Sequence, residues 1–137
     1  MPKKGEKRPP LGAGLLIVRT TDMKILLLRR SELVTKAGYW AAPGGAVEAG
    51  ETEKGAAIRE GYEEMGSLPE DLNVEEEASW YAEGPFFAFA TFMASTADRN
   101  WSPTINPEHD QWGWFDPRKL PSPIMPGTVK AVKEALL

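Results

Sequence analysis

The sequence predicts a single α/β domain in which a mixed β-sheet has helices on its faces. Three observations lead to this prediction. The chain has 137 residues, the length of one domain with a substantial hydrophobic core. Its hydrophobic and charged fractions, 42% and 26%, are those of a globular protein. Segments with the pattern of strands alternate with two segments with the pattern of helices, and this order is typical of a mixed sheet covered by helices.

The composition divides the chain into a short tail and one folded unit. Residues 1–10 hold four basic residues against one acidic residue and end in two prolines, so we expect a flexible basic tail. Residues 11–137 form the single domain. Within it, the apolar runs 11–18 and 24–28 flank a turn-like segment and predict a β-hairpin. A short strand at 39–42 follows, closed by a tight Pro-Gly-Gly loop.

The clearest helix covers residues 51–65, and Gly66 stands where a left-handed residue ends a helix. An acidic connection, 68–78, leads from this helix into the second half of the domain. There we expect strands at 79–81, 85–94 and 111–115, a long polar loop at 98–110 and a terminal helix at 127–137. The aromatic run in the second of these strands is predicted to belong to the core: Phe86, Phe87, Phe89 and Phe92.

The composition also excludes several classes of site. There is no cysteine, which excludes disulfides, thiolate nucleophiles and cysteine-held metals. The single histidine, His109, excludes a site built on several imidazoles. No apolar run approaches the ~20 residues that cross a bilayer, and we expect a cytoplasmic protein with no membrane partner. The net charge of −4 argues against a stable nucleic-acid partner, which would need a basic face.

The helix at 51–65 has a charge pattern that needs an explanation. Three of its glutamates fall on one face of the helical wheel, where we expect them to point outward: Glu60, Glu63 and Glu64. The opposite face is formed by Ile58, Gly61, Tyr62 and Met65. The like charges repel one another, and two lie where the helix dipole disfavours anions, but a bound cation would reverse both effects. Carboxylate oxygens would select Mg²⁺ or Mn²⁺. A solvated acidic face is the alternative that the charge pattern leaves open.

A glycine segment ahead of this helix favours the cation. Pro43-Gly44-Gly45 lets a backbone approach a ligand closely, so that phosphates and a metal ion could meet beside the helix. The segment and the helix together resemble the signature of the Nudix hydrolases, G-x5-E-x7-R-E-U-x-E-E-x-G-U, in which U is bulky and apolar. The match, here termed the Nudix box, covers Gly45–Ser67. It departs from the signature only at the U positions, which hold Gly61 and Ser67.

The resemblance implies the Nudix fold, an α/β/α sandwich with a mixed, partly curled β-sheet. It also implies hydrolysis of a nucleoside diphosphate linked to another group, with Mg²⁺ as the cofactor and Mn²⁺ as a substitute. The implied metal ligands are Glu60, Glu63 and Glu64. By the same resemblance Arg59 and Glu51 orient the helix and its carboxylates, and Gly45 shapes the loop. The catalytic residues expected from the box are Glu63, Glu60 and Arg59.

The general base stays open between a box glutamate, Glu108 and His109. Glu108 precedes the strand at 111–115 at a spacing similar to that of relatives, and His109 is a residue type suited to base work. Arg29 and Arg30 end a strand that leads toward the site, where either could hold a phosphate through two hydrogen bonds. Further substrate contacts are expected from Gly44, Gly45 and Tyr39, and more weakly from Trp80 and Tyr81.

The substrate expected first is a (deoxy)nucleoside triphosphate, oxidised forms included, which would give a nucleoside monophosphate and pyrophosphate. Dinucleoside polyphosphates, ADP-ribose or nucleotide sugars, and RNA 5′ ends are the alternatives. A non-catalytic nucleotide sensor is a further one, against which the complete set of box residues argues. A homodimer is left open. The box holds six acidic and two basic residues while the rest of the chain is balanced, so the acidity is local and suits a cation with a phosphate-rich ligand.

Overall fold

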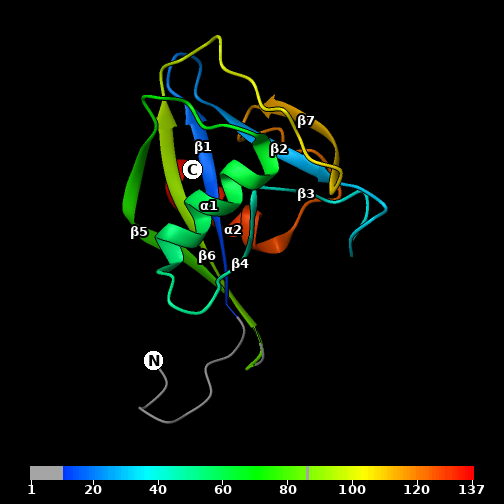
Figure 1. The fold of residues 1–137 in the computed structure, drawn as a ribbon. Helices are drawn as coiled ribbons and strands as arrows, with labels where there is room; N and C mark the ends of the chain where they lie inside the picture. Colours follow the sequence, from blue (N-terminus) through cyan, green and yellow to red (C-terminus); the bar gives the residue numbers. More distant parts are fainter. Residues whose placement is uncertain (1–10, 86) are drawn as a thin grey trace.

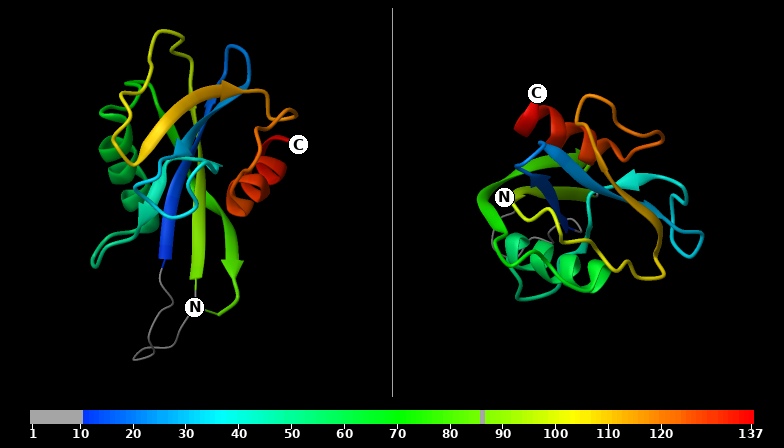
Figure 2. Two further views of the ribbon diagram at one scale, coloured as in Figure 1. Left: turned by 90° about the vertical axis from the view of Figure 1, so that its right-hand side faces the viewer. Right: turned by 90° about the horizontal axis from the view of Figure 1, so that it is seen from above.

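The computed structural model describes residues 11–85 and 87–137 (Figure 1). The basic tail expected at 1–10 and the aromatic Phe86 lie outside the described residues. The described chain folds into a mixed β-sheet with a helix on each face (Figure 2), which confirms the predicted sandwich. The elements follow in the order β1 (Leu11–Arg19), β2 (Lys24–Arg30), β3 (Trp40–Ala41), β4 (Gly44–Ala46), α1 (Glu53–Met65), β5 (Asn73–Glu83), β6 (Phe87–Thr96), β7 (His109–Phe115) and α2 (Pro126–Leu136).

Two parallel strands lie at the centre of the sheet. β1 runs parallel to β6 along its whole length, with Leu11 opposite Ala88. The strand order is β3-β2-β1-β6-β5, and two strands pair outside this path, β4 with β1 and β7 with β2. β1 and β2 form the predicted hairpin, in which Val18 lies opposite Ile25. The extra pairings place the glycine segment of β4 and the start of β7 on the two strands of this hairpin.

β1 and β2 are buried on both faces, because each contributes alternate side chains to two apolar clusters. The cluster under α1 includes Leu15, Ile17, Leu26, Leu28 and Met65. The cluster under α2 includes Leu16, Val18, Ile25, Leu27 and Val132. Burial of side chains of this size contributes about 1.5–3 kcal/mol each. The packing therefore fixes α1 against β1, and with it the direction in which the box carboxylates project.

Gly44–Ala46 forms a strand, β4, and not the tight loop that the sequence predicts. β4 pairs antiparallel with β1, with Gly45 opposite Ala13. Glycine permits this pairing, because a Cβ on Gly44 would lie 2.5 Å from the carbonyl oxygen of Ala13. The pairing of β4 with β1 therefore holds the amide groups of β4 beside α1.

The acidic stretch 68–78, predicted as a connection, contains the first residues of β5. The ladder between β5 and β6 shifts register between Val74 and Ala78, and the acidic residues between these two extend along the edge of the sheet. The last helix, α2, begins at Pro126, one residue before its predicted start. None of the helices in the described part of the chain is long and apolar enough to cross a membrane.

Candidate active site

α1 carries the acidic residues of the Nudix box, and local contacts define its two ends. The helix begins at Glu53, two residues after its predicted start, because the Thr52 hydroxyl accepts a hydrogen bond from the Gly55 amide at 3.0 Å. Gly66 ends the helix in the predicted left-handed conformation, with φ 74°. Glu51 therefore lies before the helix, where its side chain can turn back toward it.

The helical wheel predicts an outward Glu64 and an inward Tyr62, and both predictions are wrong. Glu64 is 2% exposed, whereas Tyr62 is 54% exposed. The connection from β6 to β7, residues 97–108, crosses the C-terminal part of α1 and covers Glu64. Its Asn106 amide donates a hydrogen bond to the Glu64 carbonyl oxygen at 3.0 Å. A helical wheel assumes that only the face toward the sheet is buried, so it could not predict that a distant loop buries Glu64.

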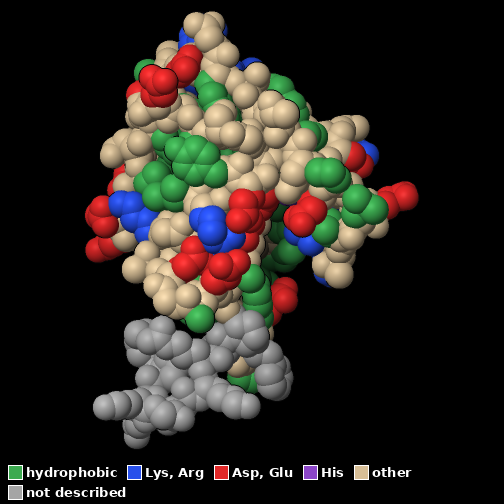
Figure 3. Space-filling model, in the orientation of Figure 1, with side chains coloured by type: hydrophobic (Ala, Val, Ile, Leu, Met, Phe, Trp, Pro, Cys, Tyr) green, Lys and Arg blue, Asp and Glu red, His purple; other side chains and the backbone are tan. Residues whose placement is uncertain are grey.

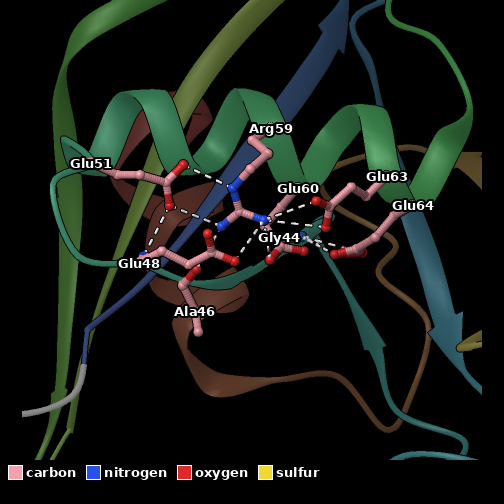
Figure 4. Close-up of polar contacts among 8 residues, drawn as sticks. All are labelled: Gly44, Ala46, Glu48, Glu51, Arg59, Glu60, Glu63 and Glu64. Atoms are coloured by element: carbon pink, nitrogen blue, oxygen red, sulfur yellow. Dashed lines mark hydrogen bonds and ion pairs between the residues drawn. The ribbon is translucent and has the colours of Figure 1, made fainter.

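Arg59 gathers the carboxylates of the box around its guanidinium group (Figure 4). Its Nε and Nη2 donate to the two oxygens of Glu51 at 2.8 and 2.9 Å, which is a bidentate pair. Nη1 donates to Glu60 and Glu63, each at 3.1 Å, and Nη2 also donates to the Ala46 carbonyl oxygen at 2.9 Å. The bond to Glu51 is the main reason why the pKa of Arg59 is raised and that of Glu51 lowered. Arg59 therefore joins α1 to β4 and fixes the direction of three carboxylates.

Glu60 and Glu64 lie one helical turn apart, and both contact β4. A Cβ on Gly45 would lie 2.5 Å from Cδ of Glu60, so glycine leaves the space that this carboxylate occupies. The Glu64 carboxylate accepts a hydrogen bond from the Gly44 amide at 3.0 Å. Burial, helped by the charge of Glu60, raises the pKa of Glu64 to about 9, and burial also raises the pKa of Glu60. A cation would stabilise the ionised form of both groups.

The chemistry of these side chains fits a hard divalent cation. Glu60, Glu63 and Glu64 offer only oxygen atoms, which Mg²⁺ and Mn²⁺ prefer. Figure 3 shows acidic side chains gathered around a basic one over α1. In the described residues, no group of three such side chains is arranged to hold an ion as it stands, and the Glu63 carboxylate is bonded to Arg59.

The segment that covers Glu64 leads to the two other candidates for the general base. Glu108 is exposed, and its charge contributes to the raised pKa of Glu64, which places it close to the site. The Ser31 amide fixes its backbone by donating to the Glu108 carbonyl oxygen at 2.8 Å. His109 is enclosed, with Nε2 3.4 Å from Oε2 of Glu64. Burial, helped by the charge of Arg30, lowers the pKa of His109 to about 4, so its imidazole is a weak base.

Arg29 and Arg30, at the end of β2, have different surroundings. Arg29 forms a bidentate pair with Asp110 at 2.8 and 3.0 Å, which neutralises its charge. Arg30 donates to the carbonyl and hydroxyl oxygens of Thr35, lines a cavity and has no carboxylate partner in the described residues. The Tyr39 ring packs against a lysine side chain and is not part of the cavity wall. Arg30 is therefore the better placed of the two arginines for an anionic ligand.

The cavity lies between β4, β5, β6 and the start of α2, and Gly44 is part of its wall. Its apolar lining is formed by Tyr81, Phe87, Phe89, Met125 and Pro126. Phe87 and Phe89 are thus not core residues, which corrects the prediction, whereas Phe92 is buried in the core as expected. Aromatic faces and a thioether form the kind of surface on which a nucleobase stacks.

Sequence reasoning missed the part of the wall that precedes and begins α2. Long-range contacts bring it there: Ile124 pairs with Trp40, and the Thr128 hydroxyl accepts a hydrogen bond from the Ala42 amide at 3.2 Å. Nothing local distinguishes the start of α2 from an ordinary helix start, so no sequence signal would have found it. Tyr81, one of the weaker sequence candidates, does lie in the wall.

The fold and the carboxylate cluster are those of a Nudix hydrolase, and residues 8–135 match the NUDIX domain, so the chain belongs to the Nudix family. An RNA pyrophosphohydrolase of Rickettsia bellii (strain OSU 85-389) is 32% identical over 133 residues, covering 84% of this chain and 80% of that protein. It follows that the chain is a Nudix pyrophosphohydrolase, and enzymes of this family generally depend on a divalent metal ion.

Solved structures show the same similarity. A MutT NUDIX hydrolase from Burkholderia pseudomallei has a TM-score of 0.76 and 29% identity, covering 94% of this chain and 99% of its own. The Ap4A hydrolase of C. elegans, in a binary complex, has a TM-score of 0.67 and 27% identity, covering 78% of this chain and 80% of its own. The whole domain, and not the box alone, is therefore shared with these proteins.

Proposed function

We propose that this protein hydrolyses a nucleoside 5′-triphosphate between its α- and β-phosphates, with Mg²⁺ or Mn²⁺ as the cofactor. Ribonucleotides, deoxynucleotides and oxidised nucleotides belong to this substrate class, and the products are a nucleoside monophosphate and pyrophosphate. The position of the cavity supports the proposal most, because its wall includes Gly44, the residue whose amide holds Glu64. A nucleoside bound in the cavity would have its phosphates beside the carboxylates of α1.

Each part of such a substrate has a matching group in the described residues. Tyr81 and Phe89 offer ring faces for a base, and one such stacked pair contributes about 0.5–1.5 kcal/mol beyond the burial of its surface. Arg30 offers a planar set of donors to phosphate oxygens from the same wall. The α1 carboxylates lie beyond Gly44. The base of the substrate would therefore lie against the two rings and its phosphates near Arg30. The cation would lie where the phosphates reach the α1 carboxylates.

The box residues supply what an inert and strongly anionic phosphoric anhydride needs. A divalent cation, when bound by Glu60, Glu63 and Glu64, neutralises phosphate charge and favours attack by water. Arg59 keeps two of these carboxylates, Glu60 and Glu63, in position through the hydrogen bonds described above. The proton of the attacking water goes to an exposed carboxylate of the site, either Glu63 or Glu108. His109 does not have this role, because its Nε2 is turned to Glu64 and its pKa is low.

A nucleotide panel tests the proposal. Purified protein is incubated with Mg²⁺ and with natural and oxidised nucleoside triphosphates, Ap4A and ADP-ribose, and the products are separated by ion-exchange chromatography. We expect monophosphate and pyrophosphate from triphosphates. Release of orthophosphate, or no turnover of any triphosphate, contradicts the proposal.

Paired variants then identify the base. Glu63→Gln and Glu108→Gln are compared with Glu70→Gln, a matched control at an exposed glutamate beyond the end of α1. Loss of a general base typically lowers kcat by ~10²–10⁴-fold. Because Glu63 is also a proposed metal ligand, the rates are compared at saturating Mg²⁺; we expect only the variant that lacks the base to keep a loss of this size there, and the control to keep full activity. If neither site variant loses activity, the assignment of the base to these two carboxylates is wrong.

The 5′-triphosphate end of RNA is a second candidate substrate, because proteins named RNA pyrophosphohydrolase are 32% identical to this chain. The same anhydride bond would be broken, but the rest of the RNA must leave the cavity. Phe87 belongs to the cavity wall and is exposed, so the wall reaches the surface at this residue. The ratio of kcat/KM for a 5′-triphosphorylated oligoribonucleotide to that for the free triphosphate with the same base decides between the two.

A further inference from the structure

His109 is enclosed between two polar side chains. Its Nδ1 lies 3.0 Å from Oδ1 of Asn106, and its Nε2 lies 3.4 Å from Oε2 of Glu64. The side chains of His109 and Glu64 are 8% and 3% exposed. Because Oδ1 of an amide only accepts hydrogen bonds, Nδ1 is the donor in this pair. The bond to Asn106 therefore fixes the plane of the imidazole and aims Nε2 at the Glu64 carboxylate.

Asn106 is tied to Glu64 a second time, through the backbone. Its amide donates to the Glu64 carbonyl oxygen at 3.0 Å, and the His109 amide donates to the Asn106 carbonyl oxygen at 3.1 Å. The turn from Asn106 to His109 thus has both of its ends against Glu64. The Gly44 amide of β4 donates to the same carboxylate. Glu64 is therefore held between β4 and this turn.

The distance between His109 and Glu64 indicates how the imidazole acts. At 3.4 Å, Nε2 is farther from Oε2 than in a short charge-assisted hydrogen bond. With the hydrogen of the neutral imidazole on Nδ1, Nε2 has none to donate to an ionised carboxylate, so the ring acts by contact and limits the positions that the carboxylate can take. Without the ring, the Glu64 side chain would gain the space that the ring now fills. A metal ligand that is free to move binds its ion more weakly.

We propose that His109 is a positioning residue that holds the Glu64 carboxylate where a divalent cation binds, and that Asn106 orients the imidazole for this role. The inference rests on the proposed function, in which Glu64 is a metal ligand. His109 and Asn106, which lie outside the Nudix box, thus join the residues that hold the metal ligands in position. The inference also gives the connection 97–108 a function beyond covering α1.

Binding of Mn²⁺ to the substrate-free protein, followed by electron paramagnetic resonance, tests this positioning role directly. Loss of a group that orients a metal ligand typically weakens binding ~10–100-fold. We expect a loss of this size for His109→Ala and a smaller one for Asn106→Ala. His109→Gln should restore much of the affinity, because its amide can occupy the place of Nε2. Asn100→Ala is the matched control, since Asn100 is exposed in the same connection, and it should bind Mn²⁺ as the unaltered protein does.

Steady-state kinetics and thermal unfolding in EDTA separate positioning from a general loss of structure. We expect His109→Ala to raise the Mg²⁺ concentration needed for half-maximal rate, with the KM for the nucleotide unchanged and the melting temperature close to that of Asn100→Ala. Glu64→Gln provides the reference for a lost ligand. If Glu64→Gln weakens Mn²⁺ binding and His109→Ala does not, the positioning role is wrong while the proposed function stands. If Glu64→Gln leaves Mn²⁺ binding unchanged, the metal site of the proposed function is itself wrong.

Discussion

The Gly44 amide donates a hydrogen bond of 3.0 Å to the Glu64 carboxylate, so strand β4 and the buried face of α1 meet at one carboxyl group. A single neutral amide does not offset the burial of an anion, and the pKa of Glu64 is accordingly raised to about 9. The fold therefore places a carboxyl group where its ionised form is disfavoured without a cation. Such a group links metal binding, protonation and stability.

We predict that Glu64→Gln stabilises the protein in EDTA. The pKa of Glu64 is 4.5 in the unfolded chain and about 9 in the folded one, so the stability that its protonated form contributes is complete below about pH 4.5 and is lost as the pH rises toward 9. Glutamine does not titrate, and its advantage should therefore grow across this range. A gain of ~1 kcal/mol at pH 8 would raise the melting temperature by ~4 °C. Thermal unfolding at pH 5, 7 and 8.5 measures the difference.

Added Mg²⁺ provides the control for this prediction. It should raise the melting temperature of the unaltered protein at pH 8 and have little effect on Glu64→Gln, because a ligand stabilises only the state that binds it. A melting temperature for Glu64→Gln that is lower than that of the unaltered protein in EDTA at pH 8.5 would contradict the prediction.

A second prediction concerns Arg59, whose guanidinium group donates six hydrogen bonds that no ammonium group can reproduce together. Arg59→Lys keeps the positive charge but loses the bidentate bond to Glu51 and the reach to Glu60 and Glu63 together. We expect kcat/KM to fall ~10²-fold, the size of loss that misplacement of catalytic groups by about 1 Å produces. The free energy of unfolding should also fall, as measured by urea unfolding, because the bonds that join α1 to β4 are lost.

The matched control for Arg59 is Arg19→Lys. Arg19 also forms a bidentate pair, with Asp22 at 3.1 and 2.7 Å, but at the far end of β1. This variant should lose no activity, although it loses stability, because the Arg19 guanidinium also lies over the Trp114 ring, 4.4 Å from its centroid. Equal losses of activity in the two variants would show that Arg59 has no special role.

A third prediction concerns the space left by Gly45. In Gly45→Ala the new methyl group would lie 2.5 Å from Cδ of Glu60, so the Glu60 carboxylate must move. We expect the rate at saturating Mg²⁺ to fall ~10²-fold, with a fold that remains intact by circular dichroism. The double variant Gly45→Ala/Glu60→Gln checks the cause. It should be no slower than Glu60→Gln alone, whereas additive losses would mean that Gly45 acts through another group.

Much of the fold and part of the site were predictable from sequence because the signals are local. The two apolar runs predicted the β1–β2 hairpin, since strands buried on both faces read as continuous apolar segments. The resemblance of the spacing from Gly45 to Gly66 predicted the sandwich, and Gly66 itself predicted the helix end. Each of these signals lies within one element or one continuous motif.

The features that sequence reasoning missed depend on contacts between distant segments. Glu64 is buried because the connection 97–108 returns to α1 through Asn106, which no periodicity within the helix reports. Phe89 lies in the wall of a cavity that is completed by the start of α2, a segment far from it in sequence. Arg29 and Arg30 read alike in sequence, and only the pairing of β2 with β7 supplies Asp110 to one of them.

The fourth prediction follows from this difference between Arg29 and Arg30. Arg30→Ala removes an arginine of the cavity wall that has no carboxylate partner in the described residues. It should raise the KM for a nucleoside triphosphate about tenfold or more, since a charge-assisted hydrogen bond contributes ~1.5–3 kcal/mol and 1.4 kcal/mol is tenfold. Arg29→Ala removes a guanidinium group already neutralised by Asp110, so it should change KM less than about threefold and cost a little stability instead. Steady-state kinetics on both variants under the same Mg²⁺ concentration makes the comparison. The reverse order of effects would place the phosphates on the Arg29 side of β2 and move the substrate out of the cavity.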